Sequence, residues 1–279
     1  MVSIELDRVT FAYPGCEDEP VFSDLSLHIA AGEWVALVGP SGAGKTTLIK
    51  LMKGLLRPQA GEVRVNGRPL PPGEINHLAA LVFANPENQI VSPVVAEDVA
   101  FGLENIGLDP ETIGLRAEEA LRWVGLWERA RDFSHHLSGG EQQRLIFAGA
   151  LALRTGCLLL DDPLCMVDGR ARTEMLTLLA DSHRREACTL VHTTHFLEEV
   201  LNAQRLLALE LGEVLFDGPP IPFLRERGLI ERLGLEVPAI VELGENLTEA
   251  GLIETAEAAS LEQLLALLID GEEELTGYT

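Results

Sequence analysis

The chain has 279 residues, of which 47% are hydrophobic and 23% are charged, an ordinary globular composition that predicts one large core with a smaller appendage and excludes a disordered chain. Acidic residues outnumber basic residues by 44 to 21, which gives a formal net charge of -23. This charge opposes binding to a nucleic-acid backbone or to an anionic lipid surface, so we expect no nucleic-acid partner and instead a basic protein surface.

The first part of the chain holds short strands typical of an antiparallel sheet. The short segments Ile4–Thr10, Leu25–Ile29 and Glu62–Asn66, with Gly and Pro between them, predict these strands. The N-terminus lacks a basic region followed by an apolar segment, so we predict no secretory signal and expect the cytoplasm as the compartment.

A second set of strands is richer in Val, Ile and Leu and alternates with helical stretches: Trp34–Val38, Leu78–Phe83, Cys157–Leu160 and Thr189–His192. Such runs predict the buried parallel strands of an α/β sheet. Pro86–Leu153 is mostly helical in pattern, with Glu111–Val124 as its clearest amphipathic segment. We therefore predict an inserted helical subdomain at about residues 87–155.

The longest apolar stretch, Leu145–Leu153, is bounded by Arg144 and Arg154. It is far shorter than the roughly 20 residues of a membrane-spanning helix, so we expect that the chain does not cross a bilayer. The four cysteines are scattered, with no Cys-x-x-Cys pair. This favours buried thiols over disulfides or a metal site.

The end of the chain changes character at Gly218. Leu206–Leu209 and Glu213–Phe216 predict a terminal hairpin, and two prolines follow Gly218. We place a domain boundary there, between residues 1–218 and 219–279. Apolar residues of the second part recur at helical spacing among many glutamates, at Leu261, Leu264, Leu265 and Leu268. They predict a helical appendage, either solvated or in contact with another subunit.

Gly39 to Thr46 read Gly-Pro-Ser-Gly-Ala-Gly-Lys-Thr, which is the nucleotide-binding P-loop pattern, and they lie between a predicted strand and a helix beginning near Lys45. Backbone N–H groups of such a loop surround phosphate, and the lysine adds a positive charge. A glycine turn that merely joins strand to helix is the alternative, which the full pattern in this context disfavours. The predicted ATP-binding residues are Gly39, Pro40, Ser41, Gly42, Ala43, Gly44, Lys45, Thr46 and Thr47.

Two residues are candidates for Mg²⁺ binding. Thr46 is the expected ligand within the P-loop, and Asp161 follows the strand Cys157–Leu160. The carboxyl end of that strand would place the aspartate beside the P-loop. An aspartate that ends a strand is by itself more often a turn residue, but the P-loop in the same chain favours the metal role.

Leu137–Arg144 read Leu-Ser-Gly-Gly-Glu-Gln-Gln-Arg, and this segment resembles the signature motif of ATP-binding cassette (ABC) proteins. A serine-capped helix alone would not explain the residues after the cap. The resemblance implies that Ser138, Gly139, Gly140 and Glu141 face the γ-phosphate of an ATP held by the opposite subunit. It also implies a P-loop ATPase core with a parallel sheet, an antiparallel β subdomain and a helical signature subdomain.

Three further positions match the family one by one. The resemblance implies that Tyr13 stacks on adenine, that Asp168 belongs to the loop between the two nucleotide sites, and that His195 contacts the γ-phosphate. Taken singly, Tyr13 could be a core aromatic and His195 a satisfied loop histidine. We favour that structural interpretation for His192, which lies inside a predicted strand.

The segments Asn85–Gln89, Ala96–Asn105 and Cys165–Asp168 are similar to energy-coupling-factor and cobalt-type ATPases, as is the acidic helical tail. The resemblance implies that the tail joins two ATPase subunits. These would grip a transmembrane coupling subunit, attached to a small substrate-capturing membrane protein, at the cytoplasmic face of the membrane. Vitamins, cobalt and nickel all stay open as the cargo.

The sequence departs from the family at two positions. Asp162 stands where the family has a catalytic glutamate, and withdrawing a carboxylate by roughly 1 Å can cost on the order of a hundredfold in rate. Ala84 stands where the family has a nucleotide-sensing glutamine, and Gln89 matches another family position. The signature is intact, so we infer a heterodimer in which this subunit contributes a degenerate site. A homodimer with slow sites stays open.

Two other functions compete with that of a transport motor. One is a nucleotide-sensing regulatory subunit with little hydrolysis, which overlaps with the degenerate-site interpretation. The other is a soluble cassette ATPase that acts on nucleic acid or ribosomes. The net charge and the presence of one cassette oppose the second alternative.

Overall fold

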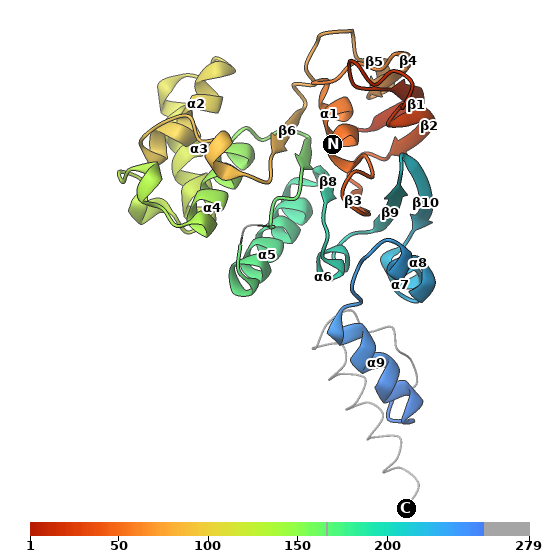
Figure 1. Ribbon diagram of the computed structural model, residues 1–279. Helices are drawn as coiled ribbons and strands as arrows, with labels where there is room; N and C mark the ends of the chain where they lie inside the picture. Colours follow the sequence, from red (N-terminus) through yellow and green to blue (C-terminus); the bar gives the residue numbers. More distant parts are fainter. Residues whose placement is uncertain (166, 254–279) are drawn as a thin grey trace, which may run out of the picture.

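The computed structural model describes residues 1–165 and 167–253, and the predicted tail helix at 261–268 lies outside the described residues, as does Met166. The described chain forms two sheets with helices around them (Figure 1). One sheet has four strands in the order β2-β1-β4-β5, and the other has six in the order β10-β9-β3-β8-β7-β6. The predicted α/β class is confirmed.

The six-stranded sheet carries the buried parallel strands that the apolar runs predicted. Only β10 is antiparallel, paired with β9 in a hairpin. All residues of β3, β7 and β8 are buried, because helices cover both faces of the sheet. The strands are β3 (Trp34–Val38), β6 (Ala79–Val82), β7 (Cys157–Leu160), β8 (Thr189–Thr193), β9 (Arg205–Glu210) and β10 (Glu213–Gly218).

The four-stranded sheet is antiparallel throughout. Strand β1 pairs with β2 and β4, and β4 pairs with β5. Its strands are β1 (Ile4–Phe11), β2 (Phe22–Ile29), β4 (Ala60–Val65) and β5 (Arg68–Pro69). One face of this sheet and one face of the larger sheet share a hydrophobic cluster with helix α1 (Lys45–Lys53), whose Leu48, Ile49 and Leu51 are fully buried. The helix that follows the P-loop therefore packs against both sheets.

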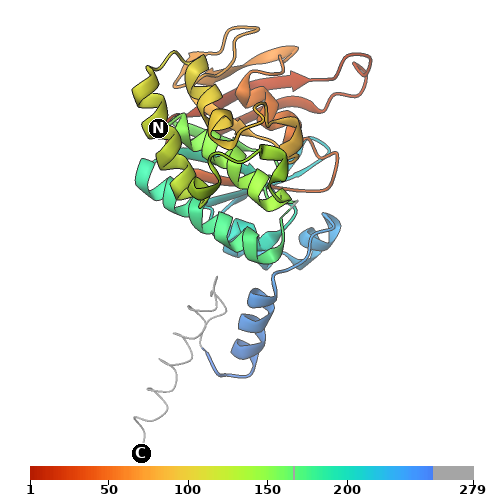
Figure 2. The same ribbon diagram turned by 90° about the vertical axis from the view of Figure 1, so that its left-hand side faces the viewer.

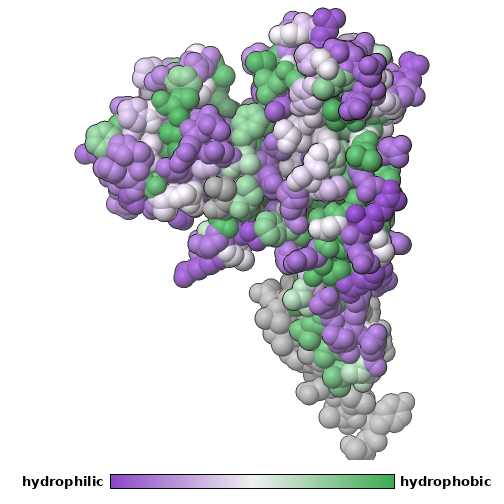
Figure 3. Space-filling model, viewed as in Figure 1, coloured by the Kyte–Doolittle hydropathy of each residue, from purple (hydrophilic) through white to green (hydrophobic). Residues whose placement is uncertain are grey.

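A helical lobe is inserted between β6 and β7, as predicted. It contains α2 (Val95–Asn105), α3 (Pro110–Trp123) and α4 (Gly139–Ala152), with short 3-10 turns at Pro86–Asn88, Trp127–Arg129 and Ser134–His136. The three helices pack through Leu103, Leu121 and Leu145, all fully buried. A notch separates this lobe from the antiparallel sheet (Figure 3).

Two of the remaining helices connect strands of the larger sheet, α5 (Gly169–Glu186) between β7 and β8 and α6 (Leu197–Val200) between β8 and β9. Three more come after β10: α7 (Pro220–Leu224), α8 (Arg227–Arg232) and α9 (Ala239–Glu249). Phe223 and Leu224 are buried in the same cluster as the parallel sheet. Packing thus continues past Gly218, and the division into domains there stays a prediction. Helix α9 projects away from the body in both views (Figures 1 and 2).

Two smaller expectations concern the membrane and the cysteines. Among residues 1–165 and 167–253, no helix is both long enough and apolar enough to span a bilayer. Cys157 and Cys188 are buried as predicted, whereas Cys16 and Cys165 are exposed. The prediction of buried thiols was wrong for these two because both lie in loops, at the surface.

Candidate functional site

The P-loop runs from the end of β3 into α1 and has the backbone geometry that cradles an anion. Gly39 has a φ of 145°, and a Cβ at this position would lie 2.1 Å from the main-chain oxygen of Leu209. Only glycine fits there. The ammonium group of Lys45 donates hydrogen bonds to the main-chain oxygens of Gly39 at 2.6 Å and Pro40 at 3.0 Å. Burial lowers the pKa of Lys45, while Asp162 and Asp161 oppose that shift.

The two predicted metal ligands are in direct contact. Thr46 Oγ1 donates to Asp161 Oδ1 at 2.9 Å, and Thr193 Oγ1 donates to the same oxygen at 3.1 Å. Asp161 is only 7% exposed. Its buried carboxylate is held in one place by these two hydroxyls. A hydroxyl and a carboxylate are the oxygen donors that Mg²⁺ prefers, and the pair fits that ion at the P-loop. Bound there with ATP, Mg²⁺ would neutralise charge on the phosphate oxygens.

A cavity of about 360 Å³ opens beside this pair. It brings together seven predicted P-loop residues with Tyr13, Asp161, Asp162 and His195. The hydroxyl of Tyr13 is hydrogen-bonded to Thr47 Oγ1 at 3.0 Å, and its ring packs edge-on against Phe11. The aromatic ring predicted to stack on adenine is therefore fixed at the rim of the phosphate-binding loop.

Asp162 and His195 face each other in the cavity. Their side chains approach to 3.4 Å, between His195 Nε2 and Asp162 Oδ2. Asp162 has a φ of 52°, and its main-chain N–H donates to Thr193 Oγ1 at 2.7 Å. Burial raises the pKa of Asp162, and the nearby charges of His195 and Lys45 oppose the shift.

Thr193 is a site residue that the sequence reasoning missed. Its hydroxyl links Asp161 to the main chain of Asp162, so it fixes both acidic residues. The predicted strand ended at His192, one residue too early. The parallel strands β7 and β8 pair Leu160 with His192, a register that the sequence alone does not show. The next residue of each strand must therefore lie at the same edge of the sheet.

Ala84 and Gln89 differ in what they bring to the site. Ala84 lines the cavity and brings no polar side-chain group to it. Gln89 Nε2 donates to the main-chain oxygen of Leu81 at 2.8 Å, and its Oε1 accepts from the N–H of Phe83 at 3.0 Å. Both ends of that amide are committed to the backbone around β6, so Gln89 does not supply the group that position 84 lacks.

The signature motif lies elsewhere in the chain. Ser138 caps α4, and the carboxylate of Glu141 accepts from its N–H at 2.8 Å and its hydroxyl at 2.9 Å. Arg129 pairs with the other oxygen of Glu141 at 2.8 Å. The predicted signature residues Ser138, Gly139, Gly140 and Glu141 are absent from the lining of the P-loop cavity.

Asp168 is also separate from the chain's own cavity. It caps α5, accepting from the N–H of Ala171 at 3.0 Å, and it is exposed. His192, by contrast, is 1% exposed and accepts a hydrogen bond from Trp34 Nε1 at 2.9 Å. Burial lowers the pKa of His192 to about 4. This histidine is therefore a neutral core residue, as its place in the strand pattern indicated.

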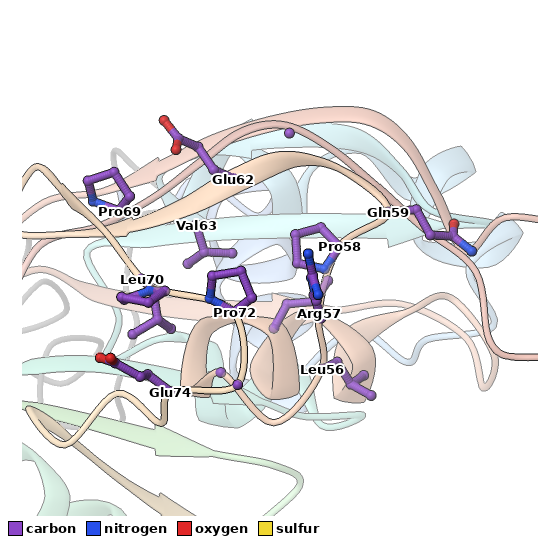
Figure 4. A pocket seen from close by; sticks show the side chains of 15 residues that line it. Leu56, Arg57, Pro58, Gln59, Glu62, Val63, Pro69, Leu70, Pro72 and Glu74 are labelled. Atoms are coloured by element: carbon purple, nitrogen blue, oxygen red, sulfur yellow. The ribbon is translucent and has the colours of Figure 1, made fainter.

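A second cavity, of about 300 Å³, lies between the end of α1 and strands β4 and β5 (Figure 4). Leu56, Pro58, Val63 and Leu70 form much of its wall. No residue of the predicted site lines it. It is therefore separate from the phosphate-binding cavity.

Comparisons with known proteins agree with this geometry. The sequence profile of the ABC transporter family matches residues 22–165. The energy-coupling factor transporter ATP-binding protein EcfA1 of Caldanaerobacter subterraneus subsp. tengcongensis is 37% identical over 272 residues, covering 95% of this chain and 98% of the relative. The chain belongs to the energy-coupling-factor branch of the ABC transporter ATPases. The EcfA1 protein of Listeria monocytogenes is similar too, at 38% identity over 95% of this chain and 97% of its own.

Solved structures of this ABC family show the same fold. The structure of cbiO1 from Clostridium perfringens, described as part of the transporter complex cbiONQ, matches with a TM-score of 0.74 and 26% identity, covering 87% of this chain and 98% of its own. The dimeric cassette MJ0796 bound to ADP and Pi matches with a TM-score of 0.71 and 28% identity, covering 78% of this chain and 98% of its own. The chain is thus an ATP-hydrolysing, transport-coupled ABC ATPase.

Proposed function

We propose that this ABC ATPase supplies the energy for an energy-coupling-factor importer of a vitamin or a transition metal ion. It would do so at the cytoplasmic face of the membrane, as the degenerate-site partner of a second ATPase subunit. The observation that carries the proposal is the separation of two anion-binding elements in one chain. The P-loop cavity holds Lys45, Thr46 and Asp161, whereas the capped N-terminus of α4 lies outside it.

That separation supports the proposal of a second ATPase subunit. Ser138 is exposed at a helix N-terminus, where N–H groups and the helix dipole favour an anion. Nothing in the chain's own phosphate cavity uses this end. A partner that presents its ATP to Ser138, and its own signature to Lys45, completes both sites. The dimeric state of the cassette MJ0796 bound to ADP and Pi supports this arrangement.

The asymmetry between the two sites rests on Asp162 and Ala84. Both residues line the cavity of this chain's P-loop. The Asp162 carboxylate is a methylene shorter than glutamate and already faces His195, and Gln89 is held by the backbone. Positioning of the attacking water therefore suffers at this site, while the signature offered to the partner keeps all of its residues.

The membrane partner has a candidate docking groove. A cavity of about 170 Å³ opens between β6 and helices α2 and α4, with Phe101, Ile146 and Leu153 in its wall. Phe101 is 47% exposed, and Val91, which also lines the cavity, is 58% exposed. A groove that is mostly apolar, with Gln89 and Asp98 as its polar lining residues, suits a partner protein better than solvent. We assign it to the transmembrane coupling subunit, with the substrate-capturing membrane protein bound beyond it.

ATP turnover tests the proposal. The purified chain alone should hydrolyse ATP slowly, and a mixture with the companion ATPase subunit should hydrolyse it robustly. In the mixture, Asp162→Glu combined with Ala84→Gln should raise total turnover, because it restores the carboxylate and the amide at this chain's site. The chain with Lys45→Ala is the control for the contribution of its own P-loop.

Two results would contradict parts of the proposal. Robust turnover by the chain alone would mean a competent homodimer. An unchanged rate after both substitutions would mean that Asp162 and Ala84 do not limit the site.

A further inference from the structure

A buried carboxylate lies directly behind the loop that carries His195. Glu199, in α6, is 1% exposed and is not part of the nucleotide cavity lining. Burial raises its pKa to about 7, although a hydrogen bond from Thr194 and the charge of Arg172 act in the opposite direction. Burying a carboxylate costs free energy unless partners compensate, so acidic residues are rarely buried this far. Its position needs an explanation.

Arg172, near the start of α5, is the charged neighbour of Glu199. Its Nε lies 3.4 Å from Glu199 Oε1. Its guanidinium carbon lies 3.7 Å from the centre of the Phe196 ring, and its Nη2 donates to the main-chain oxygen of Val167 at 3.5 Å. Stacking on a ring and a planar donor group allow arginine to hold a position that lysine would not.

The residues on both sides of His195 are held by this pair. Thr194 accepts a hydrogen bond from the N–H of Phe196 at 2.9 Å and donates one to the Glu199 carboxylate. Phe196 carries Arg172 on its ring. The main chain before and after His195 is therefore anchored, and the imidazole lies 3.4 Å from the carboxylate of Asp162.

We propose that Arg172 and Glu199 are a positioning pair that holds the His195 loop in the geometry needed to contact the terminal phosphate of ATP. Glu199 acts through Thr194, and Arg172 acts through Phe196. The inference rests on the proposed function, because it takes His195 as a residue that contacts ATP. Neither Arg172 nor Glu199 lines the nucleotide cavity, so the pair acts through His195. A chain that needed only a stable core would do as well with apolar residues here, since replacing buried ion pairs by them is often neutral or stabilising.

The test measures the affinities of the full-length chain for ATP and for ADP with Mg²⁺, by displacement of a fluorescent nucleotide. His195→Ala should lower the preference for ATP over ADP by about tenfold, the usual effect of one hydrogen bond to a charged group. Glu199→Leu and Arg172→Met should lower the preference by a similar factor and leave the ADP affinity unchanged. Combined with His195→Ala, neither substitution should lower the preference further.

Two conservative variants separate positioning from folding. Glu199→Gln keeps an acceptor for Thr194 and should retain most of the preference for ATP, while Arg172→Lys keeps the charge without the planar stack and should lose part of it. Glu198→Leu, on the same helix but exposed, is the matched control and should behave as wild type. If Glu199→Leu does not fold, as read from its urea unfolding curve, the two Arg172 variants make the same comparison.

The outcomes distinguish this inference from the function on which it rests. If the Glu199 and Arg172 variants keep the full preference while His195→Ala loses it, the pair does not position His195. The pair also acts independently of His195 if its substitutions lower the preference equally with and without His195→Ala. If His195→Ala has no effect, the inference and the assigned role of His195 both fail. If Lys45→Ala does not weaken binding of both nucleotides, the proposed nucleotide site itself is wrong.

Discussion

Glu199→Gln should make the protein more stable at alkaline pH and leave its stability unchanged at acidic pH. Burial raises the pKa of Glu199 from 4.5 to about 7, outweighing Arg172 and Thr194 and reinforced by the charges of Asp162 and Glu198. Because the folded-state pKa is the higher one, the contribution of this group to stability is complete below about pH 4.5 and is lost as the pH rises through about 7. The difference between these pKa values is worth about 3 kcal/mol.

The glutamine variant lacks this titration. Urea unfolding of the full chain at pH 5 and pH 8.5 should therefore show the free energy of unfolding of Glu199→Gln rising relative to wild type by about 2.5 kcal/mol between the two pH values, because a small part of the effect is already present at pH 5. The exposed Glu198→Gln is the control, and its difference from wild type should not change with pH. A Glu199→Gln protein less stable than wild type at pH 8.5 would refute the reasoning, because the attraction of Arg172 would then exceed the cost of burial.

Two other substitutions test the P-loop turn and the groove. Gly39→Ala should lower the free energy of unfolding by at least about 2 kcal/mol, because its Cβ would lie 2.1 Å from the Leu209 oxygen. Gly67→Ala, which has a φ of 72° and open space around it, should cost only about 1 kcal/mol, and equal costs in urea unfolding would contradict the steric argument. Phe101→Asp should weaken co-purification with the membrane coupling subunit at least tenfold, because it buries a charge in the apolar groove. Leu115→Asp, 64% exposed on α3 and away from the groove, is its control, and equal losses would exclude the groove as the docking surface.

Much of the fold could be predicted from the sequence, because the apolar runs of the parallel strands differ clearly from the short segments of the antiparallel strands. Trp34–Val38 and Cys157–Leu160 were predicted with their observed bounds. Both are buried on both faces, so each run is apolar from its first residue to its last. The packing of Phe223 and Leu224 on the main core was not foreseen. Two prolines after Gly218 indicated a break in the chain, but local composition does not show on what a later helix packs.

The site was predictable where one motif carries all its groups and less so where separate segments meet. The P-loop provides its own backbone turn, so Lys45 and Thr46 could be placed directly. Thr193 and Glu199 act through hydrogen bonds to residues of other loops, and a threonine or glutamate near a strand end has no distinctive pattern. Exposed cysteines at positions 16 and 165 show the same limit, because composition predicts average burial and not local loop geometry.

The backbone conformation at Asp162 predicts that lengthening its side chain has opposite effects on ATP turnover and on stability. Its φ of 52° lies in the left-handed region, where aspartate and asparagine are favoured over longer side chains. Asp162→Glu should therefore raise ATP turnover in the assembled complex, through its longer reach, while it lowers the free energy of unfolding by about 1 kcal/mol. Asp162→Asn should keep the stability and gain no turnover, because it fits the backbone and lacks the charge. Turnover that rises with no loss of stability would show that the strained backbone imposes no preference for aspartate. A loss of stability without any gain would show that reach does not limit hydrolysis at this site.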